Sequence, residues 1–197
     1  MCKNIVFDIG NVLLRFDPLK WLSSMYSAEQ TDLLYQAVFC SPEWALLDQG
    51  LLTDSAAVRR MAARYPEQST EIYTVFSNWD QCMTPVPGME ALVTKCFEHD
   101  LSVFALSNFS LRCRNVLHRF PTYRKIKNVL VSSEERLVKP DFRIYQRFCS
   151  KFNVLPADCI FFDDSEPNVS AARASGFQAY EFSSANQADA LIFPRNK

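Results

Sequence analysis

The sequence has little of several features that mark particular classes of protein. It contains only two histidines, His99 and His118, which excludes a metal site built mainly from histidine. Its cysteines number seven, an odd count, and none lies in a Cys-x-x-Cys pair. This favours small buried thiols in a reducing compartment over disulfides or a zinc site. The net charge of -1 shows no basic excess, so nucleic acid is not expected as a partner.

Long apolar runs are also missing. No stretch approaches the ~20 apolar residues that a membrane-spanning helix needs. The apolar start Ile5-Val6-Phe7 is interrupted at once by Asp8, unlike a secretory signal. We therefore expect a soluble, cytoplasmic protein without a membrane partner. Its 197 residues suit one core domain and a modest inserted subdomain, and the oligomeric state is not predicted.

Short apolar runs are present, and they are continuous rather than alternating. Continuous runs are typical of strands buried on both faces, as in a parallel sheet covered by helices. The runs are Ile5-Val6-Phe7, Val103-Phe104-Ala105-Leu106, Val129-Leu130-Val131 and Ile160-Phe161-Phe162. Helical stretches separate them: 89–99, one capped by Ser110 that runs to about residue 120, 142–152 after Asp141, and one beginning after Ser165. This alternation predicts an α/β fold with a doubly wound, mainly parallel, Rossmann-like sheet.

A segment without a convincing strand follows the first run. Residues 17–84 are rich in helix formers, with candidate helices at 19–25, 29–39, 55–65 and 69–80. We predict an α-helical insert here, and a core domain made of residues 1–16 and 85–197. The insert holds Trp21, Trp44 and Trp79, for which buried packing is favoured over stacking on a substrate. Asp48 precedes Gly50 at a turn, where a solvated position is favoured over reach into a site.

Polar residues follow each apolar run. Ligands of open α/β sheets bind outside the carboxyl ends of the strands, so these residues are expected to meet in one crevice. They are Asp8, Ser107 and Asn108, Lys139, and Asp163 with Asp164. Carboxylates at short range need a cation, and Lys139 supplies one positive charge. A hard divalent ion such as Mg²⁺, held by carboxylates and a substrate phosphate, would supply the rest. The set indicates phosphoryl transfer.

These motifs resemble those of the haloacid dehalogenase superfamily. They are Phe7-Asp8-Ile9-Gly10-Asn11-Val12, Leu106-Ser107-Asn108, Lys139-Pro140 and Phe162-Asp163-Asp164-Ser165-Glu166-Pro167-Asn168. Each motif is weak alone, but four in order are a specific signal, and the helical insert is similar to the family's cap. Residues 17–84 are called the cap segment from here on. The likeness is nearest to sugar-phosphate phosphatases of the α-D-glucose-1-phosphate phosphatase type.

The resemblance implies a role for each residue. Asp8 would attack phosphorus and form an aspartyl-phosphate on a small phosphorylated metabolite. Asp8, the Gly10 carbonyl and Asp164 would hold Mg²⁺, supported by Asp163. The phosphoryl oxygens would be bound by Ser107 with help from Asn108, and Lys139 would balance charge.

One position departs from the family pattern. Most phosphatases of the superfamily carry an aspartate two residues after the nucleophile, where this chain has Gly10. That aspartate protonates the leaving group, and such catalysis contributes about 10²–10⁴-fold. Three alternatives follow from the missing aspartate. A cap residue or water can supply the proton, the substrate can have a leaving group that needs no proton, or the catalytic rate can be low. Asp17 is a candidate substitute, although a helix cap before Pro18 is the favoured interpretation.

Two other functions compete with the phosphatase. A dehalogenase would use the same nucleophile on carbon without a metal, but family dehalogenases lack the paired acids seen here as Asp163 and Asp164. A non-catalytic binding protein of the same fold is supported only by Gly10. Intact Asp8, Ser107, Lys139 and Asp164 weigh against it.

Overall fold

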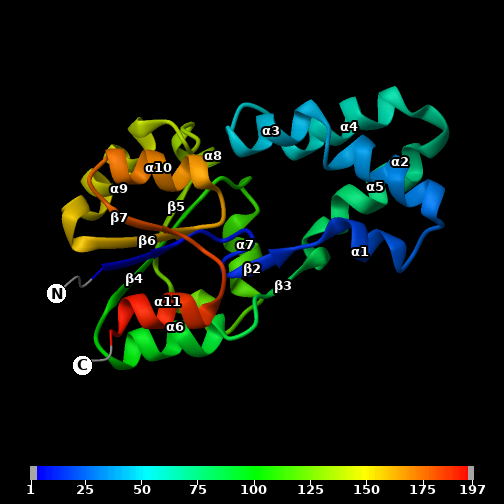
Figure 1. The fold of residues 1–197 in the computed structure, drawn as a ribbon. Coiled ribbons are helices and arrows are strands. Elements are labelled where there is room, and N and C mark those ends of the chain that lie inside the picture. The colour runs from blue at the N-terminus through cyan, green and yellow to red at the C-terminus, as the bar shows by residue number, and fades with distance from the viewer. Residues whose placement is uncertain (1–3, 195–197) are drawn as a thin grey trace.

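The computed structural model describes residues 4–194, and within this range its main sheet is parallel throughout. The strand order is β5-β4-β1-β6-β7 (Figure 1). The strands are β1 (Asn4–Phe7), β4 (Ser102–Ser107), β5 (Asn128–Val131), β6 (Cys159–Asp163) and β7 (Gln178–Glu181). The predicted doubly wound α/β fold is confirmed. The edge strand β7 was not predicted.

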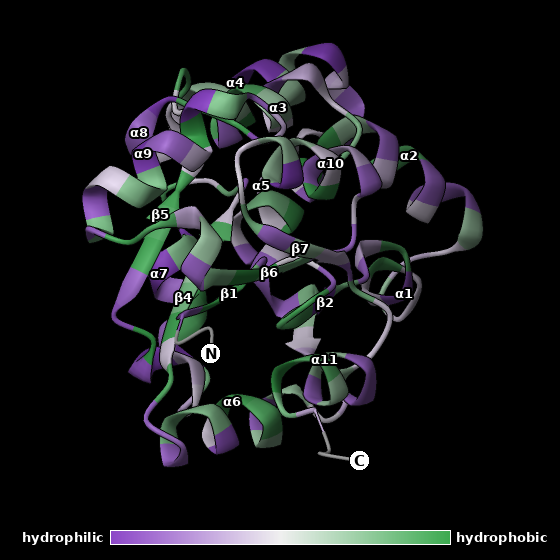
Figure 2. Cartoon of the chain, turned by 60° about the vertical axis from the view of Figure 1, so that its left-hand side comes forward, coloured by the Kyte–Doolittle hydropathy of each residue, from purple (hydrophilic) through white to green (hydrophobic). Residues whose placement is uncertain are grey.

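Both faces of the sheet are covered by helices, which explains the continuous apolar runs. In β1, Ile5 and Phe7 pack into one core cluster while Val6 packs into another. The first cluster includes residues of α6 (Met89–Glu98) and α11 (Ala185–Ile192), and the second includes residues of α9 (Phe142–Phe152) and α10 (Glu166–Ala174). Figure 2 shows apolar residues along β4 and β5, and helices of mixed polarity around them. Successive residues of a strand point to opposite faces of the sheet. Because helices cover both faces, the residues on each face are buried.

The cap segment is helical, as predicted. Its helices extend beyond one edge of the sheet (Figure 1). They are α1 (Pro18–Ser23), α2 (Ala28–Val38), α3 (Pro42–Asp48), α4 (Asp54–Arg64) and α5 (Ser69–Asn78). The short helix α3 was not predicted. At the base of the segment, β2 (Leu14–Phe16) and β3 (Met83–Pro85) form an antiparallel ribbon in which Phe16 lies opposite Met83.

Helix starts in the core were predicted with mixed success. Asp141 caps α9 as expected, because its Oδ1 accepts a hydrogen bond of 2.9 Å from the Arg143 N–H. The helix expected after Ser110 is the shorter α7 (Cys113–His118), and it begins after Arg112. The Ser110 hydroxyl accepts only a long bond, 3.4 Å, from the Arg112 N–H. A short helix, α8 (Ser132–Glu135), follows β5.

No helix of residues 4–194 combines the length and hydrophobicity of a membrane span.

The cap segment is held against the core near the end of β5. The Ser132 hydroxyl donates a 2.5 Å hydrogen bond to the Asp48 carbonyl and accepts one of 2.9 Å from the Phe109 N–H. Across the same boundary, Arg112 Nε lies 2.5 Å from Asp54 Oδ2. The turn after α3 is therefore fixed on the core by hydrogen bonds and an ion pair.

Gly50 makes this docking possible, and we expect Gly50→Ala to disrupt it. Its φ is +66°, and an added Cβ would lie 2.1 Å from the Ser133 carbonyl oxygen. A side chain in this left-handed region alone costs about 1–3 kcal/mol, and the backbone overlap must also be relieved by moving the turn. Urea unfolding should show a loss of at least that size. Gly10→Ala is the matched control, because its Cβ meets nothing within 4 Å among the described residues. Equal stability of the two variants would contradict the expectation.

Candidate active site

Asp8 lies just after β1, at the carboxyl edge of the sheet. Its N–H donates a 2.9 Å hydrogen bond to the Phe162 carbonyl, which extends the pairing with β6 by one residue. Its Oδ1 accepts a 2.6 Å bond from the Ile9 N–H, and the side chain is buried. The carboxylate is therefore fixed at the point where the central strand ends.

Lys139 is buried beside Asp8. Its Nζ lies 3.0 Å from Asp8 Oδ1 and donates hydrogen bonds of 2.6 Å to Asp163 Oδ2 and 3.0 Å to the Leu106 carbonyl. An ammonium group has three N–H donors, and three oxygen atoms surround this one. The side chain is only 1% exposed. Lys139 therefore serves as a fixed counter-charge between two carboxylates.

The side chain of Asn108 positions Lys139 by binding the Lys139 backbone. The Asn108 Oδ1 accepts a 2.8 Å bond from the Lys139 N–H, and its Nδ2 donates a 2.9 Å bond to the Lys139 carbonyl. Both the oxygen and the nitrogen of the Asn108 side-chain amide are therefore hydrogen-bonded to Lys139. A contact between Asn108 and phosphate would use the Asn108 backbone. Ser107, one residue earlier, is buried at the end of β4 and lies against Asp8.

The two acidic residues after β6 have different surroundings. Asp163 is fully buried, and its Oδ1 accepts bonds of 2.9 Å each from the Ser165 N–H and the Asn168 side chain. Asp164 is exposed, and its Oδ2 accepts one bond of 3.0 Å from Asn11 Nδ2. The Asn11 Oδ1 in turn accepts a 3.1 Å bond from the Phe16 N–H. Asp163 thus holds Lys139 in place, whereas Asp164 keeps oxygen atoms free toward the cavity.

The charges of the site are unbalanced. One carboxylate oxygen from each of Asp8, Asp163 and Asp164 lies within 4.8 Å of the others. The pKa of Asp8 is raised to about 6, mainly by burial and also by the charge of Asp163, while Lys139 and the Ser107 hydroxyl oppose the shift. Burial alone would lower the pKa of Lys139, but the two buried carboxylates hold it above its usual value. Three carboxyl groups with one lysine give the site an excess of negative charge, which a bound cation would balance.

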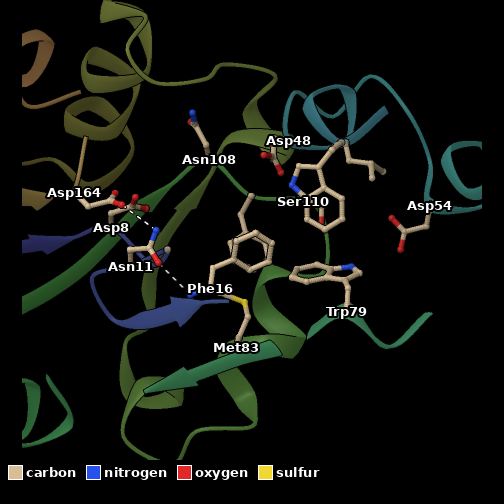
Figure 3. A pocket seen from close by; sticks show the side chains of 14 residues that line it. Asp8, Asn11, Phe16, Asp48, Asp54, Trp79, Met83, Asn108, Ser110 and Asp164 are labelled. Atoms are coloured by element: carbon tan, nitrogen blue, oxygen red, sulfur yellow. Dashed lines mark hydrogen bonds between the residues drawn. The ribbon is translucent and has the colours of Figure 1, made fainter. Parts of the chain in front are cut away.

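A cavity of about 190 Å³ opens in front of these groups. Its polar end is formed by Asp8, Gly10, Asn11, Asn108 and Asp164, and the remaining lining comes from both the core and the cap segment (Figure 3). The remaining lining residues are Phe16, Trp44, Leu47, Asp48, Asp54, Trp79, Met83, Phe109 and Ser110. The cavity is smaller than the ~300–1,000 Å³ typical of drug-sized ligand sites, so it suits a small ligand.

Aromatic rings form the wall opposite Asp8. Trp44 and Trp79 meet edge to face with centroids 5.1 Å apart, and Phe16 stacks on Trp44 at 6.0 Å. Phe109 closes the wall at 5.7 Å from Trp79. Trp44 and Trp79 therefore do more than pack cap helices together: they also face the cavity. Trp21, the third tryptophan of the cap segment, does not line it.

Several lining residues were not singled out in the sequence. Phe16 and Met83 enter the cavity because they lie opposite each other in the β2–β3 ribbon, and the sequence did not indicate that pairing. Asp48 lines the cavity rather than a solvated turn. Asp17 lies outside the cavity, and its Oδ1 accepts a 3.1 Å bond from the Lys20 N–H. The favoured interpretation of Asp17 as a helix cap is thus confirmed.

Curated proteins similar to this chain include two phosphatases. A sesquiterpene phosphatase of Aspergillus oryzae is 21% identical over 178 residues, which is 88% of this chain and 86% of the relative. A phosphatase of Mycobacterium tuberculosis is 34% identical over 96 residues, which is 48% of this chain and 44% of the relative.

Solved structures share the fold. A haloacid dehalogenase family enzyme of Bacteroides thetaiotaomicron, in complex with magnesium and inorganic phosphate, has a TM-score of 0.71 at 16% identity, covering 93% of this chain and 95% of that one. L-2-haloacid dehalogenase of Xanthobacter autotrophicus has a TM-score of 0.66 at 16% identity, covering 98% and 84%. The model of the haloacid dehalogenase-like hydrolases matches residues 2–176. Since that span covers most of the chain and every site residue from Asp8 to Asp164, the chain belongs to the haloacid dehalogenase-like hydrolase family and is a hydrolase.

Proposed function

We propose that the protein is a magnesium-dependent phosphatase that hydrolyses small phosphomonoesters through an aspartyl-phosphate on Asp8. The observation that carries the proposal is the contact between Lys139 and two buried carboxylates, with Asp164 open to the same cavity. A dehalogenase has no use for the second acidic residue at the end of β6. A pure binding protein has no use for a nucleophile fixed by its neighbours.

Each residue of the site has a distinct role in the proposed reaction. Asp8 attacks phosphorus with a carboxylate oxygen and displaces the leaving-group oxygen. Lys139 keeps Asp8 ionised and offsets the charge that an incoming phosphate adds, since its pKa is held high. Ser107 and the backbone after it contact the phosphoryl oxygens. Water then attacks the aspartyl-phosphate, which releases inorganic phosphate and restores Asp8.

The donor set fits Mg²⁺. Carboxylate and carbonyl oxygens are the ligands this ion takes, usually one or two carboxylates together with substrate phosphate. Asp8, the Gly10 carbonyl and Asp164 would hold it, with Asp163 behind them. When bound, Mg²⁺ supplies the positive charge that Lys139 alone cannot provide against three acids and a phosphate.

Metal dependence and the intermediate test the proposal together. Treatment with EDTA should abolish phosphate release from 4-nitrophenyl phosphate, and added Mg²⁺ should restore it. Acid quenching during turnover, followed by peptide mass spectrometry, should find the phosphoryl group on Asp8. Full activity in EDTA, or a phosphoryl group on another residue, would reject this mechanism.

The cavity wall supports an uncharged, partly apolar leaving group. Four aromatic rings face the phosphate end, and among the described residues no lysine or arginine lines the cavity. A second anionic group on the substrate would therefore lack a partner. The relative named a sesquiterpene phosphatase is consistent with an apolar alcohol. A sugar phosphate is the competing hypothesis, because Asp48, Asp54 and Ser110 offer polar atoms to hydroxyl groups.

A small substrate panel separates these classes. We expect kcat/KM to be highest for phenyl or short isoprenyl monophosphates and lower by about tenfold or more for 3-phosphoglycerate, whose carboxylate would lose its solvation without gaining a partner. Glucose 1-phosphate tests the sugar hypothesis directly. A preference for 3-phosphoglycerate would contradict the assignment of an uncharged leaving group.

A further inference from the structure

The site lacks a proton donor at the expected position. Gly10 has no side chain, so the leaving-group oxygen needs its proton from elsewhere. Among the described residues, the titratable groups lining the cavity are four aspartates, at 8, 48, 54 and 164. Asp8 is the nucleophile, Asp164 lies with it in the acidic cluster, and Asp54 is paired with Arg112 at 2.5 Å. Asp48 is the one that remains.

Asp48 is held over the site by its backbone. It is the last residue of α3, and its carbonyl accepts the hydrogen bond from the Ser132 hydroxyl. Two residues later, Gly50 packs directly against the Ser133 carbonyl. The position of Asp48 is thus set by the core, although the residue belongs to the cap segment.

The Asp48 carboxyl group is free and faces the cavity. Figure 3 shows it between Asn108 and Ser110, on the same cavity as Asp8. It has no hydrogen-bond or ion-pair partner within residues 4–194, unlike Asp54. An aspartate that is half-buried and has no partner gains nothing for the fold, so its placement on the cavity points to a ligand.

The surroundings also favour the protonated form. Burial raises the pKa of Asp48 to about 7, and the charge of Asp8 contributes to the shift. An ordinary aspartate, with a pKa of about 3.9, would be almost fully ionised at neutral pH. General acids work best when their pKa lies near the working pH.

We propose that Asp48 is the proton donor and acceptor of the reaction, supplied by the cap segment in place of the side chain that Gly10 lacks. The proposal rests on the proposed function. As Asp8 bonds to phosphorus, the bond from phosphorus to the leaving-group oxygen breaks, and that oxygen takes the Asp48 proton. In the second half, water bonds to phosphorus, gives a proton to Asp48, and displaces the Asp8 carboxylate as inorganic phosphate leaves.

The test compares leaving groups. Asp48→Asn should lower kcat/KM for n-butyl phosphate by about 10²–10⁴-fold, the usual contribution of general acid catalysis. For 4-nitrophenyl phosphate, whose leaving group needs no proton, kcat/KM should change less than about tenfold. Asp48→Glu should retain part of the activity on both. An equal loss on both substrates would overturn the assignment.

Two further variants sharpen the test. Asp54→Asn lines the same cavity but breaks an ion pair, so any loss should be uniform across the two substrates. Gly10→Asp in the Asp48→Asn background should recover activity on n-butyl phosphate, because the space around Gly10 is open. If this double variant forms the Asp8 intermediate yet recovers nothing on the alkyl ester, the proton-transfer role of Asp48 is wrong.

The failure of this inference can be told apart from failure of the proposed function. Asp48→Asn should still form the aspartyl-phosphate from 4-nitrophenyl phosphate, and should accumulate it because no base assists the attacking water. Absence of the intermediate in the parent protein refutes the phosphatase mechanism itself. Its presence in the parent, without accumulation in Asp48→Asn, counts against Asp48 alone.

Discussion

Asp8→Asn should abolish phosphate release, with a loss of about 10⁴-fold or more, the scale seen when a nucleophile is removed. The amide cannot attack phosphorus to form the intermediate, yet it has nearly the same shape. Its oxygen can still accept the 2.6 Å bond from the Ile9 N–H, and Lys139 keeps its partners Asp163 and Leu106. The variant should therefore fold normally by circular dichroism and thermal melting, so that initial rates report chemistry alone.

A helix-capping aspartate gives the matched control. Asp17→Asn makes the same chemical change outside the cavity, and asparagine also caps helices. Its rate should stay within about twofold of the parent, in line with the small effect of replacing one good capping residue by another. An Asp8→Asn protein with a rate near that of the parent would remove Asp8 from the mechanism and the proposed function with it.

Lys139→Met should destabilise the protein by about 3–5 kcal/mol, the range for breaking a buried ion pair by removing one partner. The lysine is 1% exposed and contacts both Asp8 and Asp163. Methionine fills similar space but leaves two buried carboxylates without a counter-charge. Urea unfolding at pH 8 measures the deficit. A loss below about 1 kcal/mol would show that the carboxylates find other compensation.

The pH dependence of that deficit has a defined sign. Lys139 is the larger of the two contacts that oppose the raised pKa of Asp8, already about 6, so removing it raises that pKa further. A folded-state pKa above the unfolded value of about 3.9 means that the folded state binds more protons. The stability of Lys139→Met should therefore increase as the pH falls from 8 toward 5. Adding Asp163→Asn should recover part of the loss at pH 8, because it removes one of the uncompensated charges.

The strand ends were predictable because their signal is local. Asp8, Ser107, Lys139 and the Asp163–Asp164 pair each follow or flank a continuous apolar run, and parallel strands bring such ends to one edge. The edge strand β7 was harder to predict, since Gln178 and Glu181 are exposed and only Ala179 is fully buried. It lacks the apolar run that marked the central strands.

The cavity wall could not be predicted because it depends on packing between distant segments. Phe16 faces Met83 across the ribbon, Trp44 comes from the short helix α3, and Phe109 comes from the loop after β4. Asp48 was considered in the sequence as a turn residue. Its true setting depends on the Ser132 hydroxyl, which is 84 residues away along the chain. No periodicity or spacing carries that information.

The antiparallel pairing of Phe16 with Met83 has a consequence for turnover. The ribbon that joins the cap helices to the sheet also supplies part of the cavity surface. Any bending of the ribbon would therefore displace Phe16 and Met83 and change the shape of the cavity. In the proposed reaction, a substitution in the ribbon should therefore change both the binding of the leaving group and the rate of its release. The element that connects the two parts of the molecule would then set the affinity for the leaving group and its release together.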